Sequence, residues 1–374
     1  MITVSSLAVD PGSGIPINQQ IKSQLTWMMA VEQLKPGERL PSVRALSAHL
    51  RVNIQTVRTA YLRLEEEGLV VTRQGFGTVV QAVDFSRFET RSRSVRSHLI
   101  GMILPSMSNP FYHTFIEGVE KTAAEDRSLL LLCCTHDDPN LAYQFFRQLL
   151  ARDVDGVILA SCLIPGLPPR DARFPLRMPV VFADSPGSRG VNILMDLENA
   201  GYLGTRHLLE HGHRRIGLIT HKMDFQNIVP INNGYRRALQ EASIPFDMDL
   251  AAPVESFDIE AGAAGARQLL ELANPPTAIF CIADMLAFGA IREIKCRGLS
   301  IPRNVAVVGF NNIPSAAFSD PPLTSVDAPA FEMGVESMKR LQGLITGTPP
   351  PEREVILPTR LVVRESCGVH PVKN

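Results

Sequence analysis

The sequence is poor in aromatic and sulfur chemistry and has no long apolar run. Aromatic residues make up 6% of the 374 residues, and there is one tryptophan. The six cysteines include no CxxC pair, the spacing that usually marks a zinc or redox site. No apolar stretch reaches the roughly 18 residues of a membrane-spanning helix. These absences argue against a disulfide framework, a cysteine-based metal centre and an integral membrane protein.

Targeting and catalytic motifs are also missing. Residues 1–16 lack the basic start and apolar core of a signal peptide, so we expect a cytoplasmic protein. The chain has no GxxxxGK[ST] phosphate loop, and no nucleophile–base pair stands out. We therefore expect neither an enzyme nor a bound cofactor.

One histidine cluster raises the question of a metal. His207 and His211 are four residues apart and share a helix face, and His213 follows them. No carboxylate or cysteine is placed to complete a zinc site. We expect no metal here.

Charge is unevenly distributed. Residues 1–98 carry a net charge of +4 and residues 99–374 a net charge of −5, which together give the net −1 of the chain. A length of 374 residues suggests two or three domains at roughly 150 residues each. The asymmetry suits a small anion-binding head on a larger, mildly acidic body.

The first eighty residues predict three helices and a hairpin. Apolar residues recur at helical spacing in 17–29, 43–50 and 54–67. Gly68 is a plausible end for the third helix. Residues 69–80 contain two β-rich runs around QGFG, which indicates a hairpin. This order of elements is that of a winged helix-turn-helix domain.

The third helix has a polar start suited to reading DNA. Asn53 is a good N-cap, as Ser42 is for the preceding helix. A buried stripe is predicted at Val57, Ala60, Tyr61 and Leu64. This leaves an outward face that could contact base edges and phosphates, formed by Ile54, Gln55, Thr56 and Arg58. A solvated surface helix would give the same local pattern. Because the helix lies within a predicted winged helix-turn-helix domain, we favour a DNA-binding role for it.

Residues 34–80, LKPGERLPSVRALSAHLRVNIQTVRTAYLRLEEEGLVVTRQGFGTVV, resemble the GntR family of bacterial transcription regulators. The resemblance extends from about Pro16 to Val80. It implies operator DNA as the partner and a DNA-binding surface that, with the two caps, consists of Ser42, Arg44, Asn53, Gln55, Thr56, Arg58, Gln74 and Gly75.

The segment 82–97 reads as a linker. It is rich in arginine and serine and has little apolar periodicity. It is either a solvated tether or a segment that touches phosphates. We therefore expect a DNA-binding domain at 1–81, a linker at 82–97 and a second domain at 98–374.

From Leu99 onward, short apolar runs alternate with amphipathic helices, which indicates parallel sheets covered on both faces. About 270 residues are too many for one such sheet, so two lobes are expected. Ligands of open α/β sheets bind beyond the carboxyl ends of the strands. A ligand would therefore lie in the cleft between the lobes.

This body resembles the effector domain of the LacI family, a relative of periplasmic sugar-binding proteins. The resemblance rests on segments such as VDGVILA, MPVVFADS, HLLEHGHRRIGLIT and VAVVGFNN. The fold expected is multidomain: an α+β winged helix-turn-helix, then a two-lobed α/β periplasmic-binding-protein-like domain. The resemblance implies that the chain crosses between lobes near Asp196, Pro329 and Leu357.

The resemblance also implies cleft residues. Phe111 and Tyr112 follow the first strand, where the family has ring-stacking side chains, and Phe257 lies where another aromatic closes the pocket. Each ring could equally belong to the core. Asp184 either accepts ligand hydroxyls or caps a turn. Asp284 is expected to cap the helix that begins at Met285.

Two positions depart from the sugar-binding pattern. Ile231 stands where relatives usually carry an arginine, and Asn311 stands where they commonly carry an aspartate. An amide offers one donor group and one acceptor, whereas a carboxylate only accepts. The amide weakens the usual contact with two ligand hydroxyls. Without an arginine at position 231, a carboxylate or phosphate on the ligand would lack its expected partner, which is costly in a closed site, so we expect a neutral ligand, which could be a sugar or a partly apolar molecule.

These features together predict a ligand-responsive transcriptional repressor. It would bind a pseudo-palindromic operator as a homodimer and respond to a small-molecule effector. The domain pairing is similar to that of bacterial arabinose repressors. The alternatives are a soluble solute-binding protein, which has no use for a winged helix, and a sugar-processing enzyme, which needs an acid–base pair.

Overall fold

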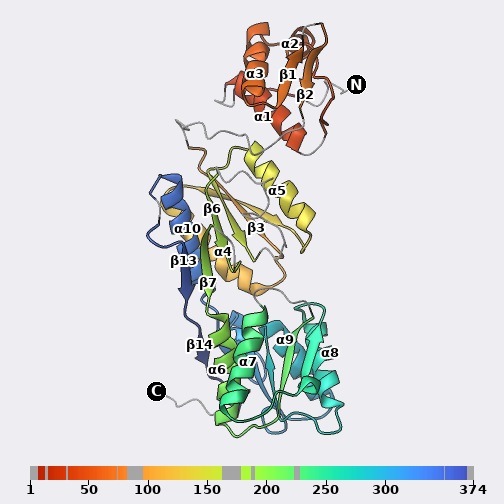
Figure 1. Cartoon of the computed structure of the whole chain (residues 1–374), viewed down its shortest axis with the longest axis vertical. Coiled ribbons are helices and arrows are strands. Elements are labelled where there is room, and N and C mark those ends of the chain that lie inside the picture. The colour runs from red at the N-terminus through yellow and green to blue at the C-terminus, as the bar shows by residue number, and fades with distance from the viewer. Residues whose placement is uncertain are drawn as a thin grey trace. The chain divides into compact units, whose positions relative to one another are not determined.

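The computed structural model describes residues 7–12, 16–30, 33–73, 75–81, 96–161, 178–186, 190–222, 228–348 and 350–368. It divides into two compact units (Figure 1). The first unit contains residues 1–105, 126–180 and 341–348, and the second contains residues 106–125, 181–340 and 349–374.

The N-terminal part of the first unit is a winged helix-turn-helix, as expected (red to orange in Figure 1). Its elements are α1 (Ile17–Ala30), α2 (Val43–Leu50), α3 (Ile54–Glu66), β1 (Val70–Arg73) and β2 (Gly77–Val80). Gly68 follows the end of α3 with φ 70°, a left-handed conformation that glycine adopts without strain. The strands β1 and β2 pair antiparallel, with Arg73 opposite Gly77.

A single apolar core holds this domain together. Its fully buried members include Ile21 of α1, Leu46 of α2, and Leu64 of α3. The segment before α2 is fixed to the wing, because Leu40 N donates to Thr78 O and Val80 N donates to Glu38 O, both at 2.9 Å. The helix-turn-helix and the wing therefore share one small frame.

The remaining strands form two six-stranded sheets. One has the order β13-β7-β6-β5-β3-β4 and the other the order β14-β12-β11-β10-β8-β9. The pairing of β12 with β14 is antiparallel, and the other pairs described are parallel. The strands are β3 (Leu99–Leu104), β4 (Leu129–Cys134), β5 (Gly156–Ala160), β6 (Val180–Ala183), β7 (Val191–Met195), β8 (Ile216–His221), β9 (Ala251–Val254), β10 (Ala278–Cys281), β11 (Ala306–Asn311), β12 (Thr324–Asp327), β13 (Glu354–Leu357) and β14 (Arg360–Val362).

Seven α-helices accompany the sheets among the described residues. They are α4 (Pro110–Glu125), α5 (Pro139–Ala151), α6 (Leu197–Glu210), α7 (Ile228–Glu241), α8 (Ile259–Leu270), α9 (Asp284–Cys296) and α10 (Ala330–Ile345). The strands β5, β8, β10 and β11 are buried along nearly their whole length. This burial explains their continuous apolar sequences.

The chain passes from one sheet to the other at the three places expected. Met195 ends β7 of one sheet, and the next strand, β8, belongs to the other. The second change follows Asp327, which ends β12, and the third lies between Leu357 of β13 and Arg360 of β14. The sequence did not predict the strands β9, β12, β13 and β14, which have three or four residues each.

Within the described residues, none of the helices is both long and apolar enough to span a bilayer. Cys133 and Cys134 are half-buried free cysteines. They lie on β4, an edge strand of its sheet.

Glycines allow α6 and α7 to pack at backbone contact. A Cβ at Gly201 would collide with the Ile231 carbonyl, and one at Gly234 would collide with the Glu198 carbonyl. A backbone neighbour cannot move aside as a flexible side chain can. The replacement Gly234→Ala should therefore destabilise the second unit by about 1–3 kcal/mol, the usual cost of overpacking.

Urea unfolding followed by circular dichroism measures this effect. The control is Asn233→Ala, at the adjacent exposed position of α7, where a change within about 0.5 kcal/mol is expected. Equal stability of the two variants would contradict the close packing of these helices.

Candidate functional site

The two helices of the helix-turn-helix begin at side-chain caps. The Ser42 hydroxyl accepts a hydrogen bond from Ala45 N at 3.1 Å, and the Asn53 side chain accepts one from Gln55 N at 2.8 Å. Both residues were predicted as caps and also as DNA contacts. Each cap uses the side-chain oxygen as an acceptor. A DNA contact would therefore use the remaining groups, the hydroxyl hydrogen of Ser42 or the amide NH₂ of Asn53.

The starts of α2 and α3 present an exposed polar face. Arg44, Gln55 and Arg58 are exposed, and Thr56 is half-buried. Ile54 is 48% exposed. The opposite face of α3 is buried, and the Tyr61 hydroxyl donates to Pro41 O at 2.8 Å, which fixes α3 to the segment preceding α2. Helix N-termini with guanidinium and amide groups beside them suit phosphates and base edges.

The wing brings a glycine-rich turn to the surface. Gly75 and Gly77 have φ values of 76° and 94°, which only glycine adopts readily. Phe76 lies between them and is 49% exposed. Gln74, a predicted DNA contact, lies outside the described residues.

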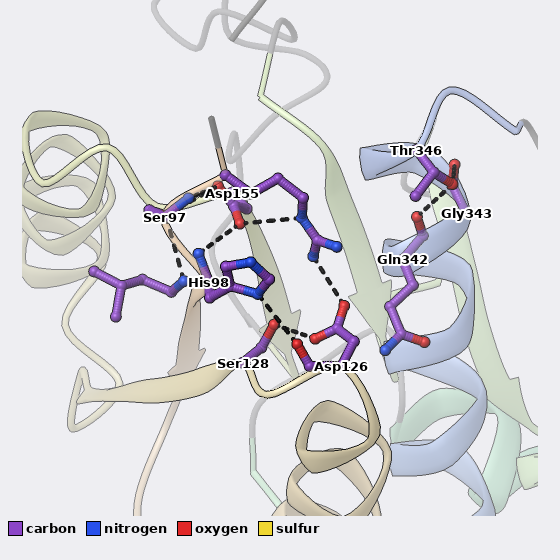
Figure 2. Close-up of polar contacts among 10 residues, drawn as sticks. Ser97, His98, Asp126, Ser128, Asp155, Gln342, Gly343 and Thr346 are labelled. Atoms are coloured by element: carbon purple, nitrogen blue, oxygen red, sulfur yellow. Dashed lines mark hydrogen bonds and ion pairs between the residues drawn. The ribbon is translucent and has the colours of Figure 1, made fainter. Parts of the chain in front are cut away.

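Most of the predicted linker also lies outside the described residues, but its end is anchored (Figure 2). Asp155 accepts hydrogen bonds from Ser97 N, Ser97 Oγ and His98 N, each at 2.9 Å. Arg96 donates to Asp126 at 2.9 Å and lies 3.5 Å from Asp155. Figure 2 places Ser128 beside Asp126, to which its hydroxyl donates.

The contacts that hold residues 96–98 shift the pKa of one of their carboxylates. Burial acts to raise the pKa of Asp126, but hydrogen bonds from Ser128 and Arg96 outweigh it and hold the pKa below its usual range. The Asp155 carboxylate is 2% exposed. The chain thus enters β3 at a defined position.

A cavity in the second unit brings together two of the predicted effector residues. Phe111 of α4 and Asn311 of β11 both line it. Its volume is about 180 Å³, which is below the roughly 300–1,000 Å³ of drug-sized pockets. The other lining residues are Thr114, Asn312, Ile313, Asp327, Ala328, Ala330, Phe331, Glu332 and Arg360.

The polar wall of the cavity is hydrogen-bonded into the sheet. Asn312 donates through Nδ2 to Asp327 at 2.8 Å and accepts from Arg364 at 2.7 Å. Asp327 also accepts from Arg360 Nε at 2.9 Å. Asn311 lies opposite Asp327 across the β11–β12 pair, with φ 108°. The wall therefore offers amide groups and carboxylates, and its one arginine is already paired.

Beneath this wall lies Asp284, and the expectation that it caps α9 was wrong. The N-cap of α9 is Ala283, which makes no side-chain cap bond. The Asp284 carboxylate instead accepts from Ile313 N at 2.8 Å and from the Ser325 hydroxyl at 2.6 Å. The side chain is buried, and burial raises its pKa to about 7. The Asp284 carboxylate binds the loop after β11 and strand β12 instead of the start of α9, because Ile313 N and the Ser325 hydroxyl lie within hydrogen-bond distance of it.

The other predicted effector residues do not line this cavity. Tyr112 is buried and packs edge-on against Phe111, with ring centroids 5.3 Å apart. Phe257 stacks on His221 at 4.8 Å. Asp184 is buried with φ 50°. Ile231 is buried in α7, with its backbone against Gly201.

Two histidines at the end of α6, His211 and His213, have local partners. His211 Nδ1 lies 2.6 Å from His207 O, and His213 Nδ1 lies 2.9 Å from Thr277 Oγ1. Burial lowers the pKa of His207 to about 4. The part of the chain that the structure describes contains no group of three His, Cys, Asp or Glu placed to hold a metal ion.

Comparison with known proteins decides the family. Residues 17–80 match the bacterial regulatory proteins of the gntR family, and residues 205–367 match the periplasmic binding protein-like domain. The chain is 32% identical over 281 residues to the HTH-type transcriptional regulator DegA of Bacillus subtilis (strain 168), covering 73% of this chain and 82% of DegA. The protein belongs to the LacI family of transcriptional regulators.

Other relatives are also regulators and not enzymes. The ribose operon repressor of Haemophilus influenzae is 32% identical over 287 residues, covering 74% of this chain and 83% of that protein. The crystal structure of a LacI-family regulator from Enterococcus faecium with bound ribose matches with a TM-score of 0.64 and 29% identity. That match covers 74% of this chain and all of the other.

Three residues that line the cavity of this LacI-family protein were not predicted from its sequence. Asp327, Glu332 and Arg360 line the cavity but were not predicted as site residues. Asp327 ends the four-residue strand β12, and a polar residue that ends a parallel strand is the signal that would have found it.

Asp284 makes the stability of this LacI-family protein depend on pH. Its folded-state pKa lies above the ordinary value of 3.8, so the folded protein keeps a proton that the unfolded chain has lost. The stability that this proton contributes is complete below about pH 4 and is lost as the pH rises through about 7. In Asp284→Asn this loss should be absent.

Urea unfolding between pH 4 and 8 measures the difference. Relative to Asp284→Asn, the unmodified protein should lose stability by on the order of 1 kcal/mol per pH unit between pH 4 and about 7, and by little more above pH 7. The control is Asp249→Asn, at an exposed carboxylate, which should follow the unmodified protein at every pH. Parallel curves for Asp284→Asn would contradict the assigned pKa.

Proposed function

We propose that this protein is a ligand-controlled repressor that binds a pseudo-palindromic operator as a homodimer. The observation that supports this most is the exposed face of Arg44, Gln55 and Arg58 on capped helices, in one chain with a polar cavity of the effector type. Because one head offers little surface, two heads would bind half-sites about one helical turn, ~34 Å, apart or a multiple of it.

Each proposed function is assigned to a consecutive segment of the chain. We propose DNA binding by residues 1–81, tethering by 82–97, and effector binding and dimerisation by 98–374. A DNA-binding regulator acts where the chromosome is, which makes the bacterial cytoplasm the proposed location. The similarity of the domain pairing to arabinose repressors stays a prediction.

The proposed DNA contacts remain Ser42, Arg44, Asn53, Gln55, Thr56, Arg58, Gln74 and Gly75. Among them, the two arginines combine exposure with the strongest hydrogen-bonding groups. Arginine forms bidentate bonds to guanine and charge-assisted bonds to phosphate. We propose that one of the two reads a base and the other binds phosphate.

The effector is proposed to be a small neutral molecule with hydroxyl groups. Asp327 and Glu332 line the cavity, and its one arginine, Arg360, is paired with Asp327. A phosphate there would meet two acids and no unpaired arginine, and an unpaired anion is costly to bury. The related H. influenzae protein is a ribose operon repressor, and the E. faecium structure contains ribose. A pentose or hexose is therefore the first candidate.

Among the proposed effector residues, Phe111 and Asn311 have the most direct support, because both line the cavity. Phe111 would pack on one face of a sugar ring, and Asn311 would bond a hydroxyl. Tyr112 would support Phe111 from the side. Asp184, Ile231 and Phe257 stay proposed effector residues on the strength of the family resemblance alone.

The test of the proposed function is operator binding by Arg44→Ala and Arg58→Ala. Loss of a base-reading arginine should cost about 1–3 kcal/mol and relax the preference at one base pair. Loss of a phosphate contact should weaken all duplexes alike and reduce the slope of log affinity against log salt by about one. Fluorescence anisotropy with a duplex selected from a random library by the full-length protein gives both quantities.

The control for these variants is Lys339→Ala, at an exposed cation of α10 that is remote in sequence from the head. It should bind the selected duplex as the unmodified protein does. Unchanged binding by both arginine variants would refute the proposed DNA interface.

Effector chemistry is tested with ribose against ribose 5-phosphate, and glucose against glucose 6-phosphate. The neutral member of a pair should bind, because the cavity carries acidic groups. In Asn311→Asp a carboxylate replaces the amide, and a charged acceptor forms the stronger bond to a hydroxyl. That variant should bind the neutral sugar about fivefold more tightly, a gain of ~1 kcal/mol.

Isothermal titration of the full-length protein measures these affinities. Asn233→Asp makes the same chemical change at an exposed position of α7 and should leave sugar affinity unaltered. Binding of a phosphorylated sugar without binding of its neutral partner would overturn the proposed effector class.

A further inference from the structure

The tip of the wing carries an aromatic side chain that folding does not explain. Phe76 is 49% exposed and is not among the residues of the domain's apolar core. Its backbone closes the turn, because Phe76 N donates to Arg73 O at 3.0 Å, and any residue could do that. A large apolar ring held in solvent is more informative than an exposed aliphatic side chain, since exposure of the ring forgoes the gain from burial.

One face of the ring is occupied by an arginine. The Arg39 guanidinium lies 3.5 Å from the centroid of Phe76. Arg39 forms an isolated antiparallel bridge with Val79, and the adjacent Leu40 is buried. The backbone thus holds Arg39 alongside the wing, and the ring then sets the plane of its guanidinium.

The stacked guanidinium keeps its hydrogen-bond donors available. Arg39 is exposed, and no ion pair or side-chain hydrogen bond of it occurs within the residues that the structure describes. The neighbouring Glu38 carboxylate accepts from Lys35 N at 2.9 Å. Stacking on an aromatic face leaves the planar fork of an arginine preorganised for a second partner.

The distance from Arg39 and Phe76 to the helix-turn-helix indicates which part of the DNA Arg39 could contact. Arg39 and Arg44 are five residues apart, so extended chain separates them by at most about 18 Å. Between them, Leu40 and Pro41 are tied to the wing and to α3 respectively. A helix in the major groove with a basic arm in the adjacent minor groove is an established way of reading DNA.

We propose that Arg39, held on Phe76, enters the minor groove beside the major-groove site of α3 and selects A·T-rich sequence there. The proposal rests on the proposed operator-binding function. Narrow A·T minor grooves have an enhanced negative potential that attracts arginine. Phe76 acts as a positioning residue, because it orients the guanidinium and limits the entropy lost when Arg39 binds.

The experiment compares two duplexes with the full-length protein. Both contain the half-sites selected by the unmodified protein, and the flank on the wing side is either A·T or G·C. The unmodified protein should prefer the A·T flank. Arg39→Ala should lower affinity for that duplex by about tenfold, the scale of one specific contact, and bind the two flanks equally.

Variants of Phe76 test the stacking itself. Phe76→Tyr retains the ring and should retain the preference, whereas Phe76→Leu retains apolar bulk and should lose most of it. In the Arg39→Ala background, Phe76→Leu should have no further effect. Circular dichroism and thermal melting confirm that each variant is folded. Lys35→Ala removes a nearby exposed charge and should leave the flank preference intact.

The outcomes separate this inference from the function on which it rests. An equal loss on both flanks in Arg39→Ala would make Arg39 a phosphate contact and overturn minor-groove selection. If Arg39→Ala binds normally while Arg44→Ala or Arg58→Ala does not, the inference fails and the operator-binding function stands. If none of the three affects binding, the operator-binding function fails as well.

Discussion

The effector half of this protein is organised around one buried carboxylate. Asp284 accepts from the backbone of Ile313 and from the hydroxyl of Ser325, and so ties the loop after β11 to the next strand. A Cβ at Gly309 would collide with the Asp284 carboxylate, which leaves glycine as the side chain that fits there. Asn311, the last residue of β11, and Asn312 after it both have positive φ. The polar wall of the cavity therefore depends on a group that no ligand would touch.

Burying this group has an energetic consequence. Withdrawal from water raises the pKa of Asp284 to about 7, so its proton is retained or lost near neutral pH. The donors around it favour the ionised form, whereas burial opposes it. A buried carboxylate with a strongly shifted pKa is more common at functional sites than elsewhere in a protein. The cavity wall is held by polar contacts that an apolar core could not replace without losing the position of Asn312.

The DNA-binding half follows a different principle. Its helices are started by Ser42 and Asn53, and its wing is closed by glycines at positive φ. These local devices leave the arginines on the surface. A ligand can regulate such a head only by binding two arrangements of the protein unequally. Coupling of this kind is typically worth about 1–3 kcal/mol, which is comparable to one specific base contact.

The sequence alone determined the elements and the family resemblance. The helices of the DNA-binding domain were predicted closely, because period and capping are local signals: the second helix was placed at residues 43–50, and α2 spans Val43–Leu50. The strand β12 was not predicted, since its sequence TSVD contains one apolar residue. The role of Asp284 depended on which loop lay opposite it. In the same way, only the tertiary structure put Asp327 and Arg360 beside Asn311, and Arg39 on Phe76, because these contacts join residues that are distant in sequence.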